Sequence, residues 1–316
     1  MQLIKALVIR LGFGVISLLI ISFVTFVASA MAPGDPARYI AGEKATEEQY
    51  LRIRAQMGLD KPLMERYGLY LSDLSQGKWG KSYQGVHEPV EDILKRSVPT
   101  TAKIALLAIT LASILGIIRG TVAALKENTI IDKMVLTTST LGVTMPNFVL
   151  APLLSYLFAV QLNWLPTTWE AELRGPEWMY LALPVVVLSL RPMALITRLT
   201  RASMVETLKM EFMRTATAKG VPPFRWTTKY ALRNAILPVV TAIGTTFGFL
   251  LTGSFVVEQF FAFPGIGRRT IEAILSNDIP VIQGCVLVTG AMFICINTII
   301  DLILPILDPR IRESQV

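Results

Sequence analysis

Long apolar blocks separated by shorter polar stretches dominate the pattern of this 316-residue chain. A helix that crosses the hydrocarbon core of a bilayer needs ~20 predominantly apolar residues. Six blocks approach that length, at residues 11–31, 101–125, 134–159, 179–197, 236–257 and 280–307. Prolines inside the third block are compatible with a span because neighbouring helices can satisfy the freed backbone groups. The pattern predicts an all-α membrane protein with six transmembrane helices.

The distribution of basic residues predicts which side of the membrane each loop occupies. Residues 198–233, between the fourth and fifth blocks, hold eight Lys or Arg and only two acids. The loop after the third block holds only Arg174, and the loop after the fifth holds Arg268 and Arg269. Basic residues in short loops mark the cytoplasmic side. We therefore expect both termini to be cytoplasmic, and we attribute the net charge of +7 to topology and anionic lipid rather than to nucleic acid.

The N-terminus imitates a secretory signal. Lys5 and Arg10 precede or open an apolar run, and Ala28-Ser29-Ala30 resembles a cleavage site. The apolar run is longer than a typical signal core, and five further blocks follow it. We expect an uncleaved first span.

Residues 32–100 form the largest polar segment, and we expect a small helical extracytoplasmic domain there. Thr46 and Gln49 have the spacing of a capping box. Asp60-Lys61-Pro62 marks the start of another helix, whose apolar stripe we interpret as a packing face. A second stripe leads into the second block. The stripes comprise Leu63, Tyr67, Tyr70, Leu71 and Leu74, and then Val90, Ile93, Leu94 and Val98.

The predicted organisation has four parts. We expect a cytoplasmic N-terminus and first span (1–31), the extracytoplasmic domain (32–100), a transmembrane core (101–307) and a cytoplasmic tail (308–316). The core includes a cytoplasmic loop at residues 198–235.

Catalytic and metal-binding patterns are missing from the sequence. His87 is the only histidine, and no His/Cys cluster has the spacing of metal ligands. Cys285 and Cys295 would lie ~15 Å apart on one helix, so we interpret them as small core residues. Gly80-Lys81-Ser82 lacks the earlier glycine of a phosphate-binding loop, and Gly265–Thr270 is an incomplete dinucleotide motif; we interpret both as turns. We expect no enzyme and no cofactor in this chain.

Charged residues within spans are candidates for function. Arg119, Arg191 and Asp301 are the cases, and each lies within about two turns of an expected cytoplasmic end, where a side chain can reach the interface. We interpret Arg119 in that way and keep both structural pairing and a pathway role open for the other two. Gly244 and Gly248 have a spacing that permits close helix packing, either inside the chain or with a partner.

The segment RTATAKGVPPFRWTTKYALRNAILP, residues 214–238, carries five basic residues and no acid. Residues 211–219 are expected to form a helix, Gly220 suits a left-handed cap, and Pro222 and Pro223 prevent continuation. A second helix is expected over 224–235. A basic loop bound to anionic lipid would explain the charge but not this compact helix–turn–helix.

At this segment the chain resembles the integral-membrane permeases of binding-protein-dependent ABC importers. Their cytoplasmic EAA loop has Glu-Ala-Ala, three residues and Gly, followed by Ile-x-Leu-Pro; here Arg214-Thr215-Ala216 and Gly220 occupy those places. Arg214 departs from the motif's glutamate. Further blocks resemble the first permease of the dipeptide/oligopeptide/nickel group, namely APGDPA, MGLDKPL, GKWGKS, TMPNFVLAPLLSYLFA, LNWLP, LITRLTRASMVETL, GSFVVEQFFAFPGIG, NDIPVIQG and NTIIDLILPILDPRIR.

The resemblance implies a permease subunit that forms half of a pathway for peptides or similar small solutes. The implied partners are a second permease, two ATPase subunits or domains that bind ATP and Mg, an extracytoplasmic substrate-binding protein and the lipid bilayer, without nucleic acid. The implied location is a bacterial or archaeal cytoplasmic membrane. The implied ATPase contacts are Arg214, Thr215, Ala216, Lys219, Gly220, Val221 and Pro222; pathway candidates are Arg191, Gly244, Thr245, Gly248 and Asp301.

Three other functions compete with this one. An ATP-independent channel or carrier would usually show more buried charge or internal symmetry. An intramembrane enzyme would need a paired nucleophile and base, or a metal set. A membrane receptor or scaffold would use the basic loop only to bind lipid.

Overall fold

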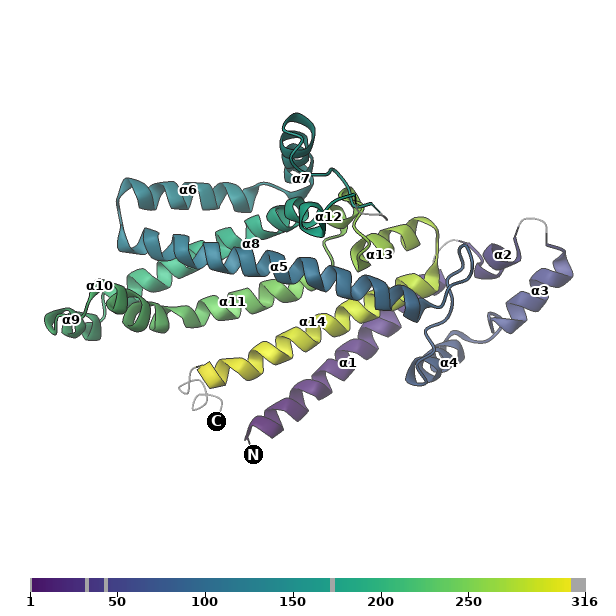
Figure 1. Ribbon diagram of the computed structural model, residues 1–316. Coiled ribbons are helices and arrows are strands. Elements are labelled where there is room, and N and C mark those ends of the chain that lie inside the picture. The colour runs from purple at the N-terminus through teal and green to yellow at the C-terminus, as the bar shows by residue number, and fades with distance from the viewer. Residues whose placement is uncertain (1, 32–33, 43–44, 171–173, 308–316) are drawn as a thin grey trace. The chain divides into compact units, whose positions relative to one another are not determined.

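The computed structural model describes residues 2–31, 34–42, 45–170 and 174–307. Within these ranges the chain is helical and has no strand, apart from one isolated bridge between Lys81 and Pro89. The expectation of an all-α protein is confirmed. The helices are α1 (Gln2–Met31), α2 (Pro36–Ala41), α3 (Glu47–Gln56), α4 (Leu63–Ser75), α5 (Val90–Leu125), α6 (Ile130–Thr144), α7 (Asn147–Ser155), η1 (Tyr156–Gln161), α8 (Glu177–Leu208), α9 (Glu211–Ala218), α10 (Pro223–Arg225), η2 (Trp226–Leu232), α11 (Arg233–Leu251), α12 (Phe255–Phe260), α13 (Ile266–Leu275) and α14 (Ile279–Leu307) (Figure 1).

Five helical stretches of the described chain are long and apolar enough to cross a membrane, and there are six if the bent pair formed by α6 and α7–η1 counts as one. The stretches are Leu7–Met31, Val90–Leu125, Glu177–Leu208, Pro223–Leu251 and Ile279–Leu302. This matches the predicted number of spans by length and composition.

The third predicted span is not one straight helix. α6 ends at Thr144, and the following pair of helical segments departs from its direction by 103° (Figure 1). Pro146 explains the break, because it lacks an N–H and disfavours helical geometry in the residue before it. Met145 accordingly has extended backbone angles, φ −77° and ψ 120°.

The helices that form the fourth and fifth predicted spans, α8 and α11, also differ from their predicted bounds. α8 does not stop near Thr197 but continues to Leu208, so the first eleven residues of the expected loop, 198–208, belong to this helix. α11 stops at Leu251 rather than continuing to residue 257. Gly253, with φ +95°, turns the chain before α12 begins. A positive φ of this kind is readily adopted only by glycine.

Contacts divide the chain into two units, residues 1–101 with 264–292 and residues 102–263 with 293–316. Residues 264–292 thus group with the first hundred residues, and the four-part division along the chain stays a prediction.

In the first unit the predicted packing stripes are observed. Tyr67 of α4 packs against Phe23 and Phe26 of α1, with ring centroids 5.1 and 5.4 Å apart. Val90 and Leu94 are buried in a cluster with Ile266, Val281 and Cys285. The capping box of α3 is present, with both Thr46–Gln49 hydrogen bonds formed. α3, α4 and the start of α5 therefore match the three helical stretches expected within residues 46–98.

Two smaller interpretations within and near this unit need correction. Gly265–Thr270 is not a turn, because Gly265 caps α13 and the following residues are its first turns. Cys285 is a buried core residue as expected, but Cys295 is exposed. α2, with Asp35 accepting from the Ala37 N–H, had not been predicted.

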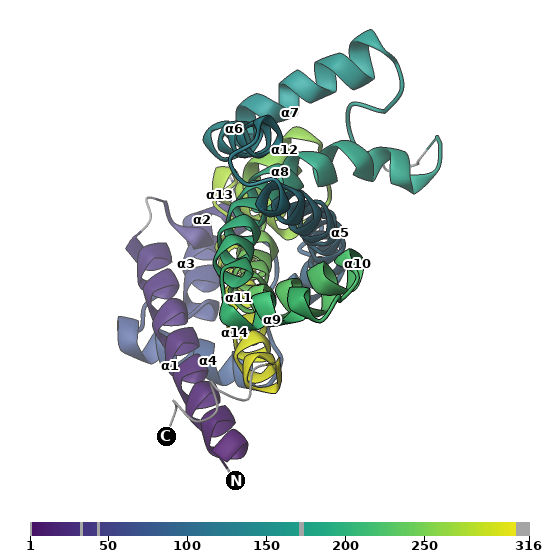
Figure 2. The ribbon, with the colours of Figure 1, turned by 90° about the vertical axis from the view of Figure 1, so that its left-hand side faces the viewer.

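In the second unit α8 is the central helix. It packs against α6 and α11, and Figure 2 shows it between them. The part of α5 after Thr101 lies so close to α8 that a Cβ on Gly120 would meet the Thr197 carbonyl oxygen at 2.6 Å. Most residues along α8 that face these neighbours are buried. This helix therefore sets the positions of the others in its unit.

A buried ion pair joins α6 to α8. The Arg201 Nε and Nη2 donate to the two Asp132 carboxylate oxygens at 2.8 and 2.7 Å. The Asn128 N–H also donates to Asp132 at 3.0 Å. The Asp132 side chain is only 3% exposed, and that of Arg201 is 21% exposed. The bidentate geometry fixes the register between the two helices.

We expect Asp132→Ala to destabilise the protein by about 2–4 kcal/mol, because it leaves a mostly buried guanidinium unpaired. Detergent-titration unfolding in mixed micelles measures this change. Glu211→Ala is the matched control, since its pair with Arg214 is exposed on both sides and should contribute less than about 0.5 kcal/mol. Equal decreases in the free energy of unfolding of the two variants would contradict a special role for Asp132.

Gly120→Ala should cost about 1–3 kcal/mol, because the new methyl group would overlap the α8 backbone and Thr200. Gly12→Ala is the control, because no atom lies within 4 Å of its added Cβ. Thermal unfolding in detergent compares the two variants. A Gly120→Ala protein as stable as Gly12→Ala would show that α5 and α8 can separate without loss.

Candidate functional site

The basic segment at residues 214–238 is a broken helix, as predicted from the sequence. α9 is an eight-residue helix that follows α8 after an extended Met210. Its apolar side chains Met213 and Ala216 are buried, at 1% and 4% exposure. Arg214, Thr215 and Lys219 are exposed on the opposite side. The helix is thus amphipathic, with a basic outer face.

The turn at Gly220 ends α9 in the predicted left-handed conformation, with φ +68°. The Gly220 N–H donates to the Thr217 carbonyl at 3.0 Å, and the Val221 N–H donates to the Ala216 carbonyl at 3.2 Å. These two bonds are those of a Schellman motif. Pro222 then caps α10, and Pro223 is its first residue. Pro222 is exposed and Val221 partly buried.

The inner face of α9 is fixed to the ends of three longer helices. Met213 lies in a buried cluster with Ala124 of α5, Met204 of α8 and Ala231 of η2. Trp226 and Tyr230 pack against the same cluster. Because α8 ends and α11 begins around this cluster, close packing joins α9 to both helices.

The outer face combines charge with apolar side chains that sequence reasoning missed. Phe224 is 80% exposed, and Met210 and Phe212 are 43% and 38% exposed. They lie among Arg214, Lys219 and Arg225, all exposed. A phenylalanine directly after two prolines in a basic segment was the available signal. We call residues 210, 212, 214, 215, 219, 220, 222, 224 and 225 the α9 surface.

The second expected helix is continuous but not regular. α10 passes into η2, a π-helical segment, and then into α11. π-helical turns are rare and often occur at functional positions. The sequence carried no signal for it.

A cavity of about 600 Å³ opens in the same unit. Arg191 and Arg198 of α8 line it, as do Thr245 and Thr246 of α11. Asn147, the first residue of α7, and Ser254 add polar groups. Leu188, Leu195, Phe249 and Leu250 supply apolar walls. This is the α8–α11 cavity.

Two of the five predicted pathway residues, Arg191 and Thr245, thus share this cavity. Gly244 and Gly248 are buried on another side of α11, where added Cβ atoms would meet Ile300 at 2.3 Å and Phe293 at 3.1 Å. Their close packing is internal to the chain. Asp301 is partly buried on α14 and does not line the cavity.

The position of Arg191 differs from the prediction that it lies near a cytoplasmic helix end. Because α8 runs from Glu177 to Leu208, Arg191 lies ~21 Å from one end and ~26 Å from the other. Arg119 does lie near the end of α5, and its Nη2 donates to Thr138 Oγ1 at 2.6 Å.

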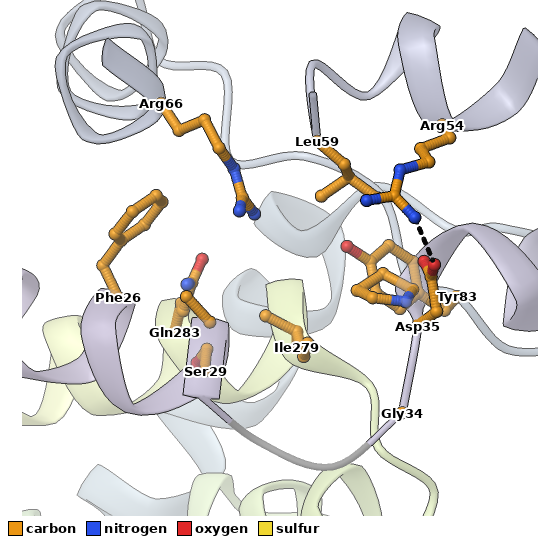
Figure 3. Close-up of a pocket in the computed structure, with 12 residues that line it drawn as sticks. Phe26, Ser29, Gly34, Asp35, Arg54, Leu59, Arg66, Tyr83, Ile279 and Gln283 are labelled. Atoms are coloured by element: carbon orange, nitrogen blue, oxygen red, sulfur yellow. Dashed lines mark hydrogen bonds and ion pairs between the residues drawn. The ribbon is translucent and has the colours of Figure 1, made fainter. Parts of the chain in front are cut away.

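A smaller cavity, about 210 Å³, lies in the first unit (Figure 3). Arg54 donates to Asp35 at 3.3 Å, and the Tyr50 hydroxyl donates to the same carboxylate at 2.5 Å. Burial opposes ionisation of Asp35, but these bonds and the Ala37 N–H lower its pKa. Burial and the nearby Asp278 carboxylate raise the pKa of Tyr83 to about 12. The charged groups here serve the local structure.

No group of three or more potential metal ligands occurs among the residues that the structure describes. His87 is exposed, and its Nδ1 lies 3.1 Å from the Ser82 carbonyl oxygen.

Comparison with known proteins identifies the family. Residues 112–313 match the model of the binding-protein-dependent transport system inner membrane component. Residues 3–105 match the model of the N-terminal region of such membrane components.

Relatives match along nearly the whole chain. The dipeptide transport system permease protein DppB of Bacillus subtilis is 39% identical over 298 residues, which cover 94% of each protein. A putative peptide transport system permease protein of Brucella abortus is 39% identical, with 93% of this chain and 95% of the relative covered. The glutathione transport system permease protein GsiC of Escherichia coli K12 is 38% identical, with 94% and 95% covered. The chain therefore belongs to the binding-protein-dependent ABC transporter permeases, in their dipeptide/oligopeptide group.

Proposed function

We propose that this protein is one of two permease subunits of an ATP-driven importer in a bacterial inner membrane. It would form half of a pathway for peptides or similar small solutes that a substrate-binding protein delivers. The relatives are named as permeases for dipeptides, peptides or glutathione, and these names support this substrate class. ATP and Mg would bind to two ATPase subunits or domains, so that this chain itself is not an enzyme.

The observation that carries the proposal is the α9 surface. It presents Phe224, Arg214 and Lys219 outward, while Met213 on the inner face is fixed to α8 and η2. An exposed aromatic among cations is suited to a partner with an apolar groove and acidic rim. We assign the ATPase contact to this surface, including the backbone turn at Gly220.

The same assignment sets the topology. The α9 surface faces the cytoplasm, where the ATPases and the basic loops lie. With six crossings both termini are cytoplasmic, and residues 32–100 face the binding protein.

ATP-driven closure of the ATPases would move α9, and through its buried cluster would move the α8 and α11 walls of the cavity. Alternation between outward and inward opening requires that ATP bind the two states with different affinity. Arg191 and Thr245 are the pathway residues that this arrangement favours.

Gly220→Val should reduce ATP-driven uptake of radiolabelled dialanine at least tenfold in proteoliposomes that hold the complete transporter, while membrane insertion is retained. Valine at positive φ costs about 1–2 kcal/mol and deforms the turn. Gly220→Asn is the matched control, because asparagine adopts positive φ far more readily than valine and no atom lies within 4 Å of a Cβ added at Gly220. Similar uptake in the two variants would contradict coupling through Gly220, and uptake without ATP would favour a channel.

Phe224→Ala should weaken the binding of the ATPase subunits to the permease, because it removes a side chain that anchors the proposed contact. We expect at least a threefold lower recovery of ATPase subunits when the permease is purified in mild detergent. Phe13→Ala on α1, 66% exposed, should leave recovery unchanged. Unchanged recovery for Phe224→Ala would place the contact elsewhere.

A further inference from the structure

We propose that Arg191 and Arg198 form an anion subsite that binds a carboxylate group of the transported solute. This inference rests on the proposed function, because it places a charge-selective element inside the proposed pathway.

The two arginines lie on one face of α8. Seven residues separate them, which is about two turns and ~10.5 Å of helix. Both line the α8–α11 cavity, and both are exposed in the chain. A solute in the cavity could therefore contact either guanidinium.

No acidic residue of the part of the chain that the structure describes is paired with either arginine. The cavity lining includes no Asp or Glu. Neither arginine has an ion pair or side-chain hydrogen bond to any residue of the described chain. Arg201, three residues after Arg198, is by contrast paired with Asp132. The same helix thus carries one arginine neutralised for packing and two whose donors remain available.

The rest of the lining suits a small organic acid. Hydroxyl groups of Thr245, Thr246 and Ser254 and the amide of Asn147 provide further polar contacts. Leucine and phenylalanine side chains line the remaining wall. Guanidinium groups match the planar geometry of a carboxylate, and a cavity of about 600 Å³ accommodates a small peptide.

The place of Arg191 along α8 favours a transported solute over a lipid phosphate. The residue lies near the middle of α8, ~21 Å and ~26 Å from its ends. Lipid phosphates lie at the two borders of a hydrocarbon core ~30 Å thick. An isolated charge within a membrane span is costly, and a carboxylate that enters the pathway would offset that cost.

Charge-selective cysteine labelling tests the subsite without transport. In a Cys285→Ala, Cys295→Ala background, Thr245→Cys places a reporter in the cavity and Ser75→Cys places one on α4. The complete transporter, without ATP in phosphatidylcholine nanodiscs, is labelled with sulfonatoethyl or trimethylammonioethyl methanethiosulfonate. We expect the ratio of the labelling rate with the anionic reagent to that with the cationic reagent to be about tenfold higher at position 245 than at position 75. One or two nearby charges would produce a difference of this size.

Arg191→Gln with Arg198→Gln should remove this preference, and Arg191→Lys with Arg198→Lys should retain most of it. Arg174→Gln is the control, because Arg174 is exposed and does not line the cavity. N-acetyl-dialanine should slow labelling at position 245, whereas its C-terminal amide should not.

Three results would overturn the subsite: no anion preference with both arginines present, equal protection by the amide, or protection by inorganic phosphate but not by the carboxylate. The last two would indicate apolar binding and a phosphate site, respectively. The proposed function fails separately, in the ATP-driven uptake of the Gly220→Val variant, because labelling requires neither ATP nor transport.

Discussion

The close approach of α5 to α8 is the constraint on which the second unit depends. At Gly116 and Gly120 the two helices leave no room for a side chain, and a Cβ there would meet Ile196 or the Thr197 backbone. In a bilayer the hydrophobic effect drives little association between helices, because lipid tails are as apolar as the side chains. Tight packing and polar links must therefore hold the helices together. The Asp132–Arg201 pair supplies the polar link from a third helix. α8 is held on several sides, and its arginines are held with it.

Local chemistry predicted much of this structure. The capping box at Thr46, the left-handed glycine at 220 and the apolar stripes each depend on a few neighbouring residues, and each occurs as expected. Block length alone predicted the number of candidate spans. The resemblance to a transporter family rested on ordered motifs, and the family match confirmed it.

Features that depend on distant partners could not be read in the same way. Pro146 was visible, but a proline inside an apolar block is compatible with a kinked span or with a 103° break. The end of α8 was placed too early because its polar residues 198–207 resemble a loop until Arg201 is seen to pair with Asp132. The exposure of Phe224 and the shared cavity of Arg191 and Thr245 follow from packing among helices far apart in the chain. For the same reason, Gly244 and Gly248 could not be assigned to internal packing from their spacing alone.

Because α8 is one continuous helix, a tilt at one of its ends would displace the residues farther along it. α8 is one continuous helix of ~48 Å that joins the buried cluster beneath α9 to the cavity, with Pro184 and Pro192 inside it. A tilt of about 5° about its α9 end would carry Arg191 sideways by about 2 Å, given ~26 Å of helix between them. That displacement is comparable to the difference between a hydrogen-bonded and a separated ion pair. If the proposed subsite binds a solute, a small angular change at the α9 end of α8 would be sufficient to make or break that binding without unfolding the helix between.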